Sequence, residues 1–414
     1  MEQSTCIIDG LSVTLHTPTS VADLASLVQQ AKSQDKAVYP CGGRTSLGFG
    51  RPPTKPGVGV SLTSLNQVVD FPARDMTITV QTGLTLSDLR QTLAVENLRL
   101  PIDAPQKGSA TIGGMLATNT SGLRRYGHGT LRDYVIGISA VNDNGQEFKG
   151  GGRVVKNVAG YDMCKLLIGS LGTLGIITQV TFKVLPVPEL TALVTLACRE
   201  DDLEAVLSLV HESRTRPTCF EVVNGPTMQW LNENHGCELP GEAWLVVVGF
   251  ESNADTVNWQ VQQIMKEVNC RQCLEVRVVT TDSALWNALT ELPGTSGLPF
   301  SVKGSVLPSR CASFCTQVAQ ALENPLIHAH AGNGIVSWHS PETDPDRAKT
   351  VLGQLRQVAS EQGGNVVVWN CPTEWKSQLD IWGSTRSDAK LMQRIKAQID
   401  PQNVFNPGRY LNGL

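Results

Sequence analysis

The sequence lacks the long apolar runs and the strong net charge that define several large classes of protein. Apolar stretches such as residues 243–250 are far shorter than the roughly 18 residues of a membrane-spanning helix, so we expect no direct membrane insertion. The net charge of -4 argues against nucleic acid as the main partner. The N-terminus has neither a basic region nor an apolar core, so we expect no signal peptide and a cytoplasmic protein.

The 11 cysteines follow no disulfide framework, which favours reduced thiols in a cytosol. Cys270 and Cys273 form a CxxC pair, and Cys311 and Cys315 lie four residues apart on an expected helix. Four cysteines can hold zinc or an iron–sulfur cluster. Their spacing matches no standard cluster motif, and no proline follows a closing cysteine. We therefore interpret them as core cysteines.

Charge is also scarce, at 17% of residues against a usual share of about 25%, so much of the chain is core or contact surface. The 414 residues are enough for two or three domains. What the sequence does have is glycine, serine and threonine, gathered between apolar strands over residues 110–185. Glycine has no Cβ to hold a ligand away, and successive backbone amides form a concave anion site. The pattern predicts a bulky, phosphate-bearing cofactor.

The first half of the chain reads as strands and helices separated by Gly-rich loops. Ser20 and Thr85 each begin an N-cap pattern, after which apolar residues recur at helical spacing. Pro186 and Pro188 end the last strand, so we place a domain boundary near Glu189. The expected strands of this half include residues 37–39, 76–80, 134–141 and 176–185.

The second half repeats a different order of elements. Residues 193–279 read as strand, helix, strand, strand, helix, strand, which is the ferredoxin-like βαββαβ unit, and residues 301–369 repeat that order. We expect two such units side by side, forming one extended antiparallel sheet with helices on one face. The predicted fold class is α+β.

The Gly-rich loops are specific only in combination. The loop PCGGRTSLGFG at residues 40–50 is not a Rossmann fingerprint, because no G-x-G-x-x-G opens a helix, and not a P-loop, because no Gly-Lys-Ser/Thr is present. Taken singly, each loop is more often an ordinary turn than a binding site. Together they form an ordered series: PCGGRTS, ATIGGMLATNTSG, RYGHGTLRDYV, KNVAGYDMCKLLIGSLGTLGIIT and a C-terminal DPQNVFNPGRY.

This series resembles the FAD-binding domain of the vanillyl-alcohol oxidase / p-cresol methylhydroxylase superfamily. Within it, the chain is most similar to the E-type FAD-binding subunit of bacterial glycolate oxidase (glycolate dehydrogenase). The resemblance is close over residues 4–189 and looser beyond, apart from HAHAGNGIV and the C-terminal motif. It implies a two-subdomain FAD-binding domain at residues 1–188, a ferredoxin-like cap or substrate domain at 189–395, and a tail at 396–414 that returns to the FAD domain.

The resemblance also implies which residues bind FAD. The first loop would cradle the pyrophosphate, the ATIGG segment would run beside the flavin and ribityl chain, and SLGTLGIIT would hold the adenine end and the ribose. The implied FAD-binding residues are Cys41, Gly42, Gly43, Arg44, Thr45, Ser46, Thr111, Ile112, Gly113, Gly114, Ala117, Thr118, Gly122, Gly172, Thr173, Gly175, Ile176, Ile177, Asn406 and Arg409.

Some members of this superfamily link FAD covalently through a histidine in the first Gly-rich loop. That loop contains no histidine here, and His128 in RYGHGTL is the nearest alternative. We favour His128 as a polar loop residue and predict non-covalent, dissociable FAD. His330 and, more weakly, His128 are the candidate catalytic residues near the isoalloxazine.

On the substrate side the sequence departs from the resemblance. Members that oxidise 2-hydroxy acids commonly carry HAGDGN and, later, EHG, which supply ligands for a divalent metal and for the substrate carboxylate. Here Asn333 replaces the aspartate of the first motif and Ile335 replaces its asparagine. Around Glu374, where the second motif is expected, there is no histidine.

A metal site needs three or more ligands at workable spacing. His328 and His330 alternate on an expected strand and so share a face, whereas His339 is expected to point to the other face. We therefore favour hydrogen-bonded histidines packed at the domain interface and predict no metal site.

The resemblance implies a FAD-binding subunit of a complex that oxidises glycolate or D-lactate, with a D-type flavoprotein subunit and an iron–sulfur subunit as partners. Those partners would provide any association with the inner membrane. Two alternatives stay open. The chain is either a stabilising or electron-relay subunit whose own substrate site has decayed, or a stand-alone FAD-dependent dehydrogenase with a site that uses no metal. Activity of the isolated chain distinguishes them.

Overall fold

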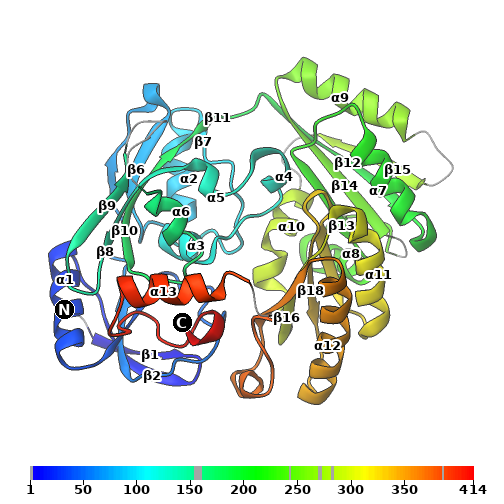
Figure 1. The fold of residues 1–414 in the computed structure, drawn as a ribbon. Helices are drawn as coiled ribbons and strands as arrows, with labels where there is room; N and C mark the ends of the chain where they lie inside the picture. The colour runs from blue at the N-terminus through cyan, green and yellow to red at the C-terminus, as the bar shows by residue number, and fades with distance from the viewer. Residues whose placement is uncertain (1–2, 153–160, 242–243, 269–272, 281–283, 385–386) are drawn as a thin grey trace. The chain divides into compact units, whose positions relative to one another are not determined.

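The computed structural model describes residues 3–152, 161–241, 244–268, 273–280, 284–384 and 387–414 (Figure 1). The chain divides into two compact units. Unit 1 comprises residues 1–121, 130–187 and 385–414, and unit 2 comprises residues 122–129 and 188–384. The main boundary therefore follows Val187, two residues before Glu189. Within the described residues, no helix combines the length and the apolar character needed to cross a membrane.

The first sheet of unit 1 has the strand order β1-β2-β4-β3. β1 and β2 form an antiparallel hairpin, whereas β4 pairs in parallel with both β2 and β3. Helix α1 packs on this sheet, and the Ser20 side chain caps it by accepting a hydrogen bond from the Asp23 backbone amide at 3.0 Å, as the sequence predicted. The bounds are β1 (Gln3–Ile8), β2 (Leu11–His16), α1 (Val21–Ser33), β3 (Ala37–Cys41) and β4 (Gly57–Ser61).

The second sheet of unit 1 is antiparallel, with the order β5-β6-β10-β8-β9. Its central strands bury Ile78, Val180 and Phe182 in one core with the apolar residues of helices α2, α3 and α6. The bounds are β5 (Val68–Asp70), β6 (Thr77–Gln81), α2 (Leu86–Ala94), β7 (Leu98–Arg99), α3 (Ile112–Thr118), α5 (Leu131–Tyr134), β8 (Val135–Val141), β9 (Glu147–Gly151), α6 (Met163–Leu167), β10 (Ile176–Lys183) and β11 (Leu185–Pro186).

The C-terminal segment belongs to unit 1 and is anchored there by a buried lysine. Lys396, on helix α13 (Ala389–Ile399), donates hydrogen bonds to the Asp400 carboxylate and to the carbonyls of Thr173 and Phe405 at 2.6, 2.7 and 3.0 Å. Phe405 also forms a parallel bridge with Val38 of β3. One ammonium group thus joins the terminal segment to the Gly-rich turn at 172–175.

Unit 2 contains one eight-stranded antiparallel sheet with the order β15-β12-β14-β13-β17-β18-β16-β19. Each half has the ferredoxin-like order, and the halves meet where β13 pairs with β17. The strand bounds are β12 (Leu190–Cys198), β13 (Cys219–Val223), β14 (Trp244–Ser252), β15 (Cys273–Thr280), β16 (Phe300–Ser305), β17 (Leu326–His330), β18 (Ile335–Ser340) and β19 (Asn365–Asn370).

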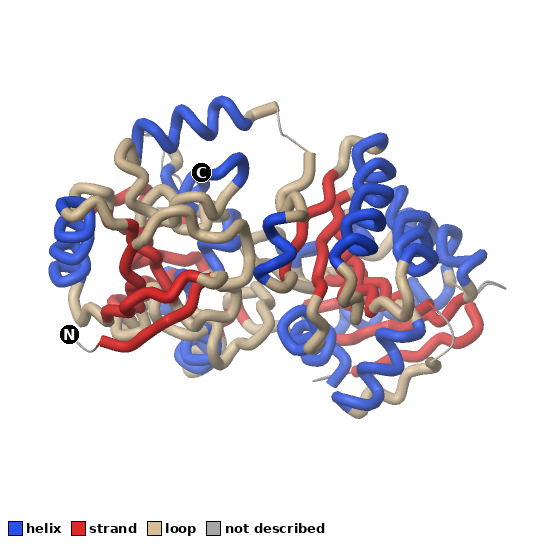
Figure 2. Tube along the Cα trace, turned by 90° about the horizontal axis from the view of Figure 1, so that it is seen from below, coloured by secondary structure: helices blue, strands red, loops and turns tan. Residues whose placement is uncertain are grey.

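Helices cover both faces of this sheet, which corrects the expectation of helices on one face (Figure 2). The two ferredoxin-like units supply α7 (Leu203–Glu212), α9 (Ala254–Glu267), α11 (Cys311–Ala321) and α12 (Pro345–Glu361). Two further helices, α8 (Gly225–His235) and α10 (Ala284–Thr295), pack together against Cys219 and Val223 on the other face. These two helices were not predicted, because each is inserted next to a strand and lies outside the βαββαβ repeat.

A short segment at residues 122–129, which contains helix α4 (Arg125–His128), clusters with unit 2 although its neighbours in the chain belong to unit 1. Its Gly127 amide donates to the Thr218 carbonyl at 3.1 Å, and the Tyr126 ring meets the Phe220 ring edge-on at 5.8 Å. The FAD-domain prediction of one continuous segment at 1–188 did not anticipate this excursion.

Candidate functional site

The first Gly-rich loop lies so close to the segment at 109–111 that only glycine fits. A Cβ on Gly43 would overlap the Ser109 carbonyl oxygen, and one on Gly42 would overlap the Thr111 hydroxyl. Arg44, next in the loop, has a left-handed φ of 60°. The close approach explains why both residues before Arg44 are glycine.

This loop presents a run of main-chain donors to a hollow. Within the described residues, the backbone amides of residues 42–47 donate no hydrogen bond to the protein. The hollow beside them has a volume of about 90 Å³ and is bounded by the loop, by α3 and by the C-terminal segment. Unbonded amides that converge on a concave surface bind phosphate well, so the residues present fit the pyrophosphate of FAD.

Twelve of the predicted FAD-binding residues line this hollow. They are Cys41, Gly42, Gly43, Arg44, Thr45, Ser46, Thr111, Gly114, Ala117, Thr118, Asn406 and Arg409. The hollow is also lined by five residues that were not predicted, namely Ile8, Pro40, Leu47, Phe49 and Leu171. Pro40, Leu47 and Phe49 belong to the predicted loop at residues 40–50, although they were not selected as binding residues. Ile8 and Leu171 come from distant segments that only the fold brings here.

The other predicted residues do not line the hollow. Gly113 approaches Thr82, whose carbonyl accepts the Gly113 amide hydrogen bond at 2.8 Å, and Gly172 lies behind Pro40 and Asn406. Gly122 belongs to unit 2. Ile112, Thr173, Ile176 and Ile177 are buried, and Gly175 has a φ of 152°.

Arg409 holds the loop from behind. Its guanidinium donates to the Asp9 carboxylate at 2.5 Å, to the Arg51 carbonyl at 2.9 Å and to the Phe49 carbonyl at 2.8 Å, and it also donates to the Leu47 carbonyl. Arg409 was predicted to bind FAD directly; the contacts that the structure shows hold in place the loop that carries the unbonded amides.

The first loop also contains a cysteine, Cys41, whose chemistry bears on the flavin linkage. Burial raises the pKa of the Cys41 thiol to about 12, and the sulfur donates to the Tyr39 carbonyl at 3.5 Å. The thiol therefore stays protonated at neutral pH and is a poor nucleophile.

In unit 2, the predicted catalytic residue His330 belongs to a cluster with His328 and Glu221. Glu221 lies on β13 directly opposite His330 of β17, and its carboxylate oxygen Oε2 is 2.7 Å from His330 Nδ1 and 2.9 Å from His328 Nε2. The side chains of Glu221 and His328 are 0% and 4% exposed, and that of His330 is 14% exposed. Sequence reasoning missed Glu221 because it is more than 100 residues away and carries no motif.

His339 lies on the same sheet face as His328 and His330, which corrects the expected opposite face. The pairing of Leu326 with His339 and of His328 with Ser337 sets this orientation. The prediction counted alternating faces from His330 to His339 as if they were on one strand. The turn at residues 331–334 separates two strands, so the alternation does not continue through it. His339 Nδ1 is 2.7 Å from the Ser301 hydroxyl, and burial lowers the pKa of His339 to about 4, so it stays neutral at pH 7.

The same face carries a lysine in a cationic environment. Lys303 pairs across β16 and β18 with Ser337, and its ammonium lies 5.8 Å from the centre of the Trp369 ring. Loss of water around the ammonium and the positive charge of Arg125 lower the pKa of Lys303 to about 8. Within the described residues, no carboxylate forms an ion pair with Lys303.

His128, the weaker catalytic candidate, lies in a separate ion-pair group. Arg124 makes a bidentate contact with Glu251, with its Nη2 donating to Oε1 at 2.7 Å, and stacks over the Trp286 ring at 4.3 Å. His128 Nε2 is 3.5 Å from Oε2 of the same carboxylate. These contacts attach the 122–129 segment to the sheet of unit 2.

The cysteine candidates form no cluster within the described part of the chain. Cys311 and Cys315 are buried on α11. The hydrogen bond with Cys311, and to a lesser extent burial, raise the pKa of the Cys315 thiol well above its usual value. Cys273 begins β15, and Cys270 lies outside the described residues.

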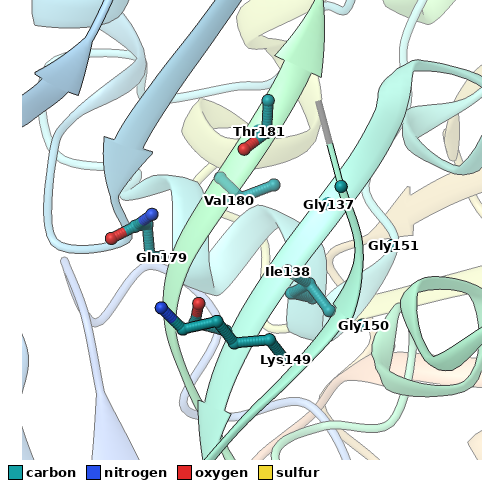
Figure 3. A pocket seen from close by; sticks show the side chains of 10 residues that line it. Gly137, Ile138, Lys149, Gly150, Gly151, Gln179, Val180 and Thr181 are labelled. Atoms are coloured by element: carbon teal, nitrogen blue, oxygen red, sulfur yellow. The ribbon is translucent and has the colours of Figure 1, made fainter. Parts of the chain in front are cut away.

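A second hollow, of about 210 Å³, lies on the β8-β9-β10 sheet of unit 1 (Figure 3). Gly137, Gly150 and Gly151 leave its floor without side chains, and Lys149 and Gln179 border it. None of the predicted site residues is among the described residues that line it.

Comparisons with known proteins agree with this organisation. Residues 14–151 match the family described as FAD binding domain, and residues 189–367 and 384–410 match FAD linked oxidases, C-terminal domain. The chain is 33% identical to D-2-hydroxyglutarate dehydrogenase of Xanthomonas citri pv. viticola, over 95% of this chain and 88% of the relative. It is 27% identical to glycolate oxidase subunit GlcD of Bacillus subtilis, over 95% and 87% respectively.

The fold is shared with solved structures of low identity. A p-cresol methylhydroxylase structure with substrate bound superposes with a TM-score of 0.69 at 16% identity, covering 96% of this chain and 88% of that one. An alkyldihydroxyacetonephosphate synthase structure superposes with a TM-score of 0.70 at 18% identity, covering 97% and 78%. At these identities the likeness concerns the fold alone.

Proposed function

The chain belongs to the FAD-linked oxidases, and from that premise we propose that it is the FAD-binding subunit of a glycolate oxidase (glycolate dehydrogenase) complex. The complex would oxidise glycolate, or the related 2-hydroxy acid D-lactate, to the 2-oxo acid. Its partners would be a D-type flavoprotein subunit and an iron–sulfur subunit, on the cytoplasmic side of the membrane. The similarity to relatives named as glycolate oxidase, D-2-hydroxyglutarate dehydrogenase and D-lactate dehydrogenase supports the substrate class.

The proposal that this chain binds FAD rests on the backbone amides of residues 42–47, which donate no hydrogen bond within the described residues. Together with the Arg44 side chain and the Ser46 hydroxyl, these amides would hold the FAD pyrophosphate, and FAD would be bound without a covalent link. When bound, FAD supplies the acceptor for the hydride equivalent lost from the substrate α-carbon. Arg409 keeps these amides in place, because its guanidinium donates hydrogen bonds to carbonyls of the same loop.

On the substrate side, Lys303 is the residue we assign to the carboxylate of the 2-hydroxy acid. Its ammonium has an aromatic neighbour in Trp369 and a cationic one in Arg125, and a substrate anion would relieve the repulsion between the two cations. His330 remains the catalytic candidate on the same sheet face, where its imidazole would hold or move the hydroxyl proton.

A second function is favoured by a specific observation. Asn333 and Ile335 stand where 2-hydroxy-acid oxidising relatives carry an acidic and an amide residue, and no histidine is present near Glu374. A subunit that binds FAD but only stabilises the complex or relays electrons would tolerate those replacements. A stand-alone dehydrogenase with another alcohol substrate is a third reading.

The test is a visible spectrum of the purified full chain, recorded without oxygen before and after adding glycolate and then D-lactate. Bleaching of the flavin bands supports a working substrate site in this chain. Flavin bands that persist with both acids, but bleach once the partner subunits are added, would assign substrate oxidation to the partner. A protein that gains no flavin bands with added FAD overturns the cofactor assignment.

The Lys303→Gln variant sharpens the same test. Under the proposed function it keeps its flavin bands and bleaches only at much higher glycolate concentration. The matched control is Lys349→Gln, which removes an exposed lysine of helix α12 in the same unit. Equal glycolate dependence in both variants would contradict the role of Lys303.

A further inference from the structure

The two edges of the eight-stranded sheet in unit 2 differ in how their backbone is covered. At one edge, the Val368 amide of β19 donates to the Ile381 carbonyl at 2.9 Å, so the segment that follows β19 covers it. At the other edge, β15 pairs with β12 on one side (Figure 1). Among the described residues, none hydrogen-bonds the outer side of the β15 backbone over residues 274–280. Such an edge presents N–H and C=O groups that can pair with another strand.

The sequence of β15 lacks the residues that usually block an open edge. Natural edge strands often carry proline or lysine, and residues 273–280 contain neither. Four of these eight residues are leucine or valine, which favour strand pairing. The one irregularity is a bulge at Leu274, which has no partner on β12, and residues 275–280 pair with β12 in regular register. The open edge is therefore suited to pairing with a further strand.

Exposed apolar side chains accompany this edge. Leu274 and Val278 of β15 are 61% and 42% exposed. Val278 pairs with Val194, on the face of the sheet opposite helices α8 and α10. Helix α9, which packs against β12 and β14, adds the exposed side chains of Trp259 and Met265. Large apolar side chains that gather in this way are typical of an interaction surface, whereas single ones scattered over a protein are not.

The charges of β15 are complementary to those of a second copy of the same strand. Glu275 and Arg277 are 38% and 50% exposed and form an ion pair with one another. If two β15 strands pair antiparallel about Val276, Glu275 of each chain lies opposite Arg277 of the other. Leu274 then lies opposite Val278 of the other chain. Opposite charges that face one another across two strands stabilise the pair.

The same charges exclude the neighbouring registers. A shift of two residues keeps each side chain on its face of the sheet, but it would put Glu275 opposite Glu275 in one direction and Arg277 opposite Arg277 in the other. Like charges directly opposite one another destabilise a strand pair. A shift of one residue would move the apolar side chains to the other face. The sequence of β15 therefore favours one symmetric register.

We infer that β15 is the interface of a homodimer, in which two chains pair their β15 strands antiparallel about Val276. The pairing would join the two eight-stranded sheets into one continuous sheet across a twofold axis. A twofold axis makes each contact occur twice, so both charge pairs form together. The inference goes beyond the proposed function and does not depend on it, because it concerns neither FAD nor the substrate.

The experiment is analytical ultracentrifugation of the purified full chain over a range of concentrations. We expect a wild-type dimer that dissociates on dilution. Glu275→Arg and Arg277→Glu should each weaken dimerisation by on the order of 10- to 100-fold, because each puts like charges opposite one another in both pairs. Glu361→Arg, a charge reversal at the exposed end of helix α12, is the control and should dimerise like the wild type. Circular dichroism checks that the variants are folded.

A mixture of the two weakened variants tests the register itself. In a dimer of one Glu275→Arg chain with one Arg277→Glu chain, both cross-strand pairs again join opposite charges. The mixture should therefore form heterodimers at concentrations where each variant alone is monomeric. Loss of the ion pair within each chain is not repaired by mixing, so recovery of the dimer cannot come from that contact.

Three results would overturn the inference. The first is a wild-type chain that stays monomeric over the whole concentration range, including one that associates only with another kind of subunit. The second is a dimer that both charge reversals leave unchanged. The third is a mixture of the two variants that stays monomeric although the wild type dimerises. None of them depends on whether glycolate bleaches the flavin, so failure of the dimer and failure of the proposed function are distinguishable.

Discussion

The two candidate sites of this protein are built on opposite principles. In unit 1 the site is made of main-chain amides in one short loop, and glycines create it by leaving side chains out. In unit 2 the site is made of side chains from separate strands, brought together by cross-strand register. A main-chain site can be recognised from one contiguous motif. A side-chain site on a sheet is made of residues that are far apart in the chain and that no single motif identifies.

The comparison predicts different sensitivities. A main-chain site should tolerate changes of polar side chains but not the addition of a Cβ or the loss of the contacts that hold the loop. A side-chain site should respond to conservative changes of single charged groups, with little effect on the fold. Four expected outcomes follow, beginning with the largest effect.

The largest effect is expected where unit 1 holds its C-terminal segment. Lys396→Met would remove the ammonium that bonds the Thr173 and Phe405 carbonyls and would leave the Asp400 carboxylate buried without its cation. Breaking a buried pair on one side costs about 3–5 kcal/mol. Urea unfolding should show this loss. Lys390→Met, on the exposed side of the same helix, is the control, and equal stability of the two variants would contradict the role of Lys396.

The next effect concerns the loop itself. Gly43→Ala should weaken FAD binding by roughly 100-fold, about 2.7 kcal/mol, because its Cβ would overlap the Ser109 carbonyl oxygen and push the loop away. Titration of flavin fluorescence with the apoprotein measures this. Gly353→Ala, in helix α12 where a Cβ meets nothing within 4 Å, should bind FAD like the wild type. An FAD affinity of Gly43→Ala equal to that of the wild type would contradict the proposal that the backbone amides of this loop bind FAD.

In unit 2, Lys303→Gln should raise the glycolate KM by roughly tenfold while kcat and thermal stability change little, because an ionic contact with the substrate anion is lost. Steady-state kinetics of the complex, or of the isolated chain if it is active, provide the measurement. A fall in kcat with unchanged KM would instead place Lys303 in the reaction and not in substrate binding.

The smallest effect is a pH dependence with a definite sign. The pKa of Lys303 is lowered to about 8, so the cation is present below pH 8 and is lost as the pH rises through that value. Glycolate affinity should therefore fall several-fold between pH 7 and pH 9, since only the protonated lysine attracts the anion. Lys303→Arg, whose group stays protonated, should flatten the profile. A wild-type profile that is flat over this range would argue against the assignment.

The success and failure of sequence reasoning follow the same division. The caps at Ser20 and Thr85 were predictable because each joins residues three positions apart. The ferredoxin-like order was predictable because each of its strands and helices has its own local pattern. Helices α8 and α10 were missed because they are additions to a repeat. The orientation of His339 was wrong because the period of a strand cannot be counted through a turn.

The phosphate-bearing cofactor could be predicted from the Gly-rich loops and their order along the chain, because the absence of a Cβ and the presence of a backbone amide are local properties. Three contacts could be seen only in the folded chain: Glu221 with His330, Lys303 near Arg125, and Arg409 with the first loop. Each of those contacts joins residues far apart in the chain, and strand register and packing, which no local pattern encodes, set the distances between them.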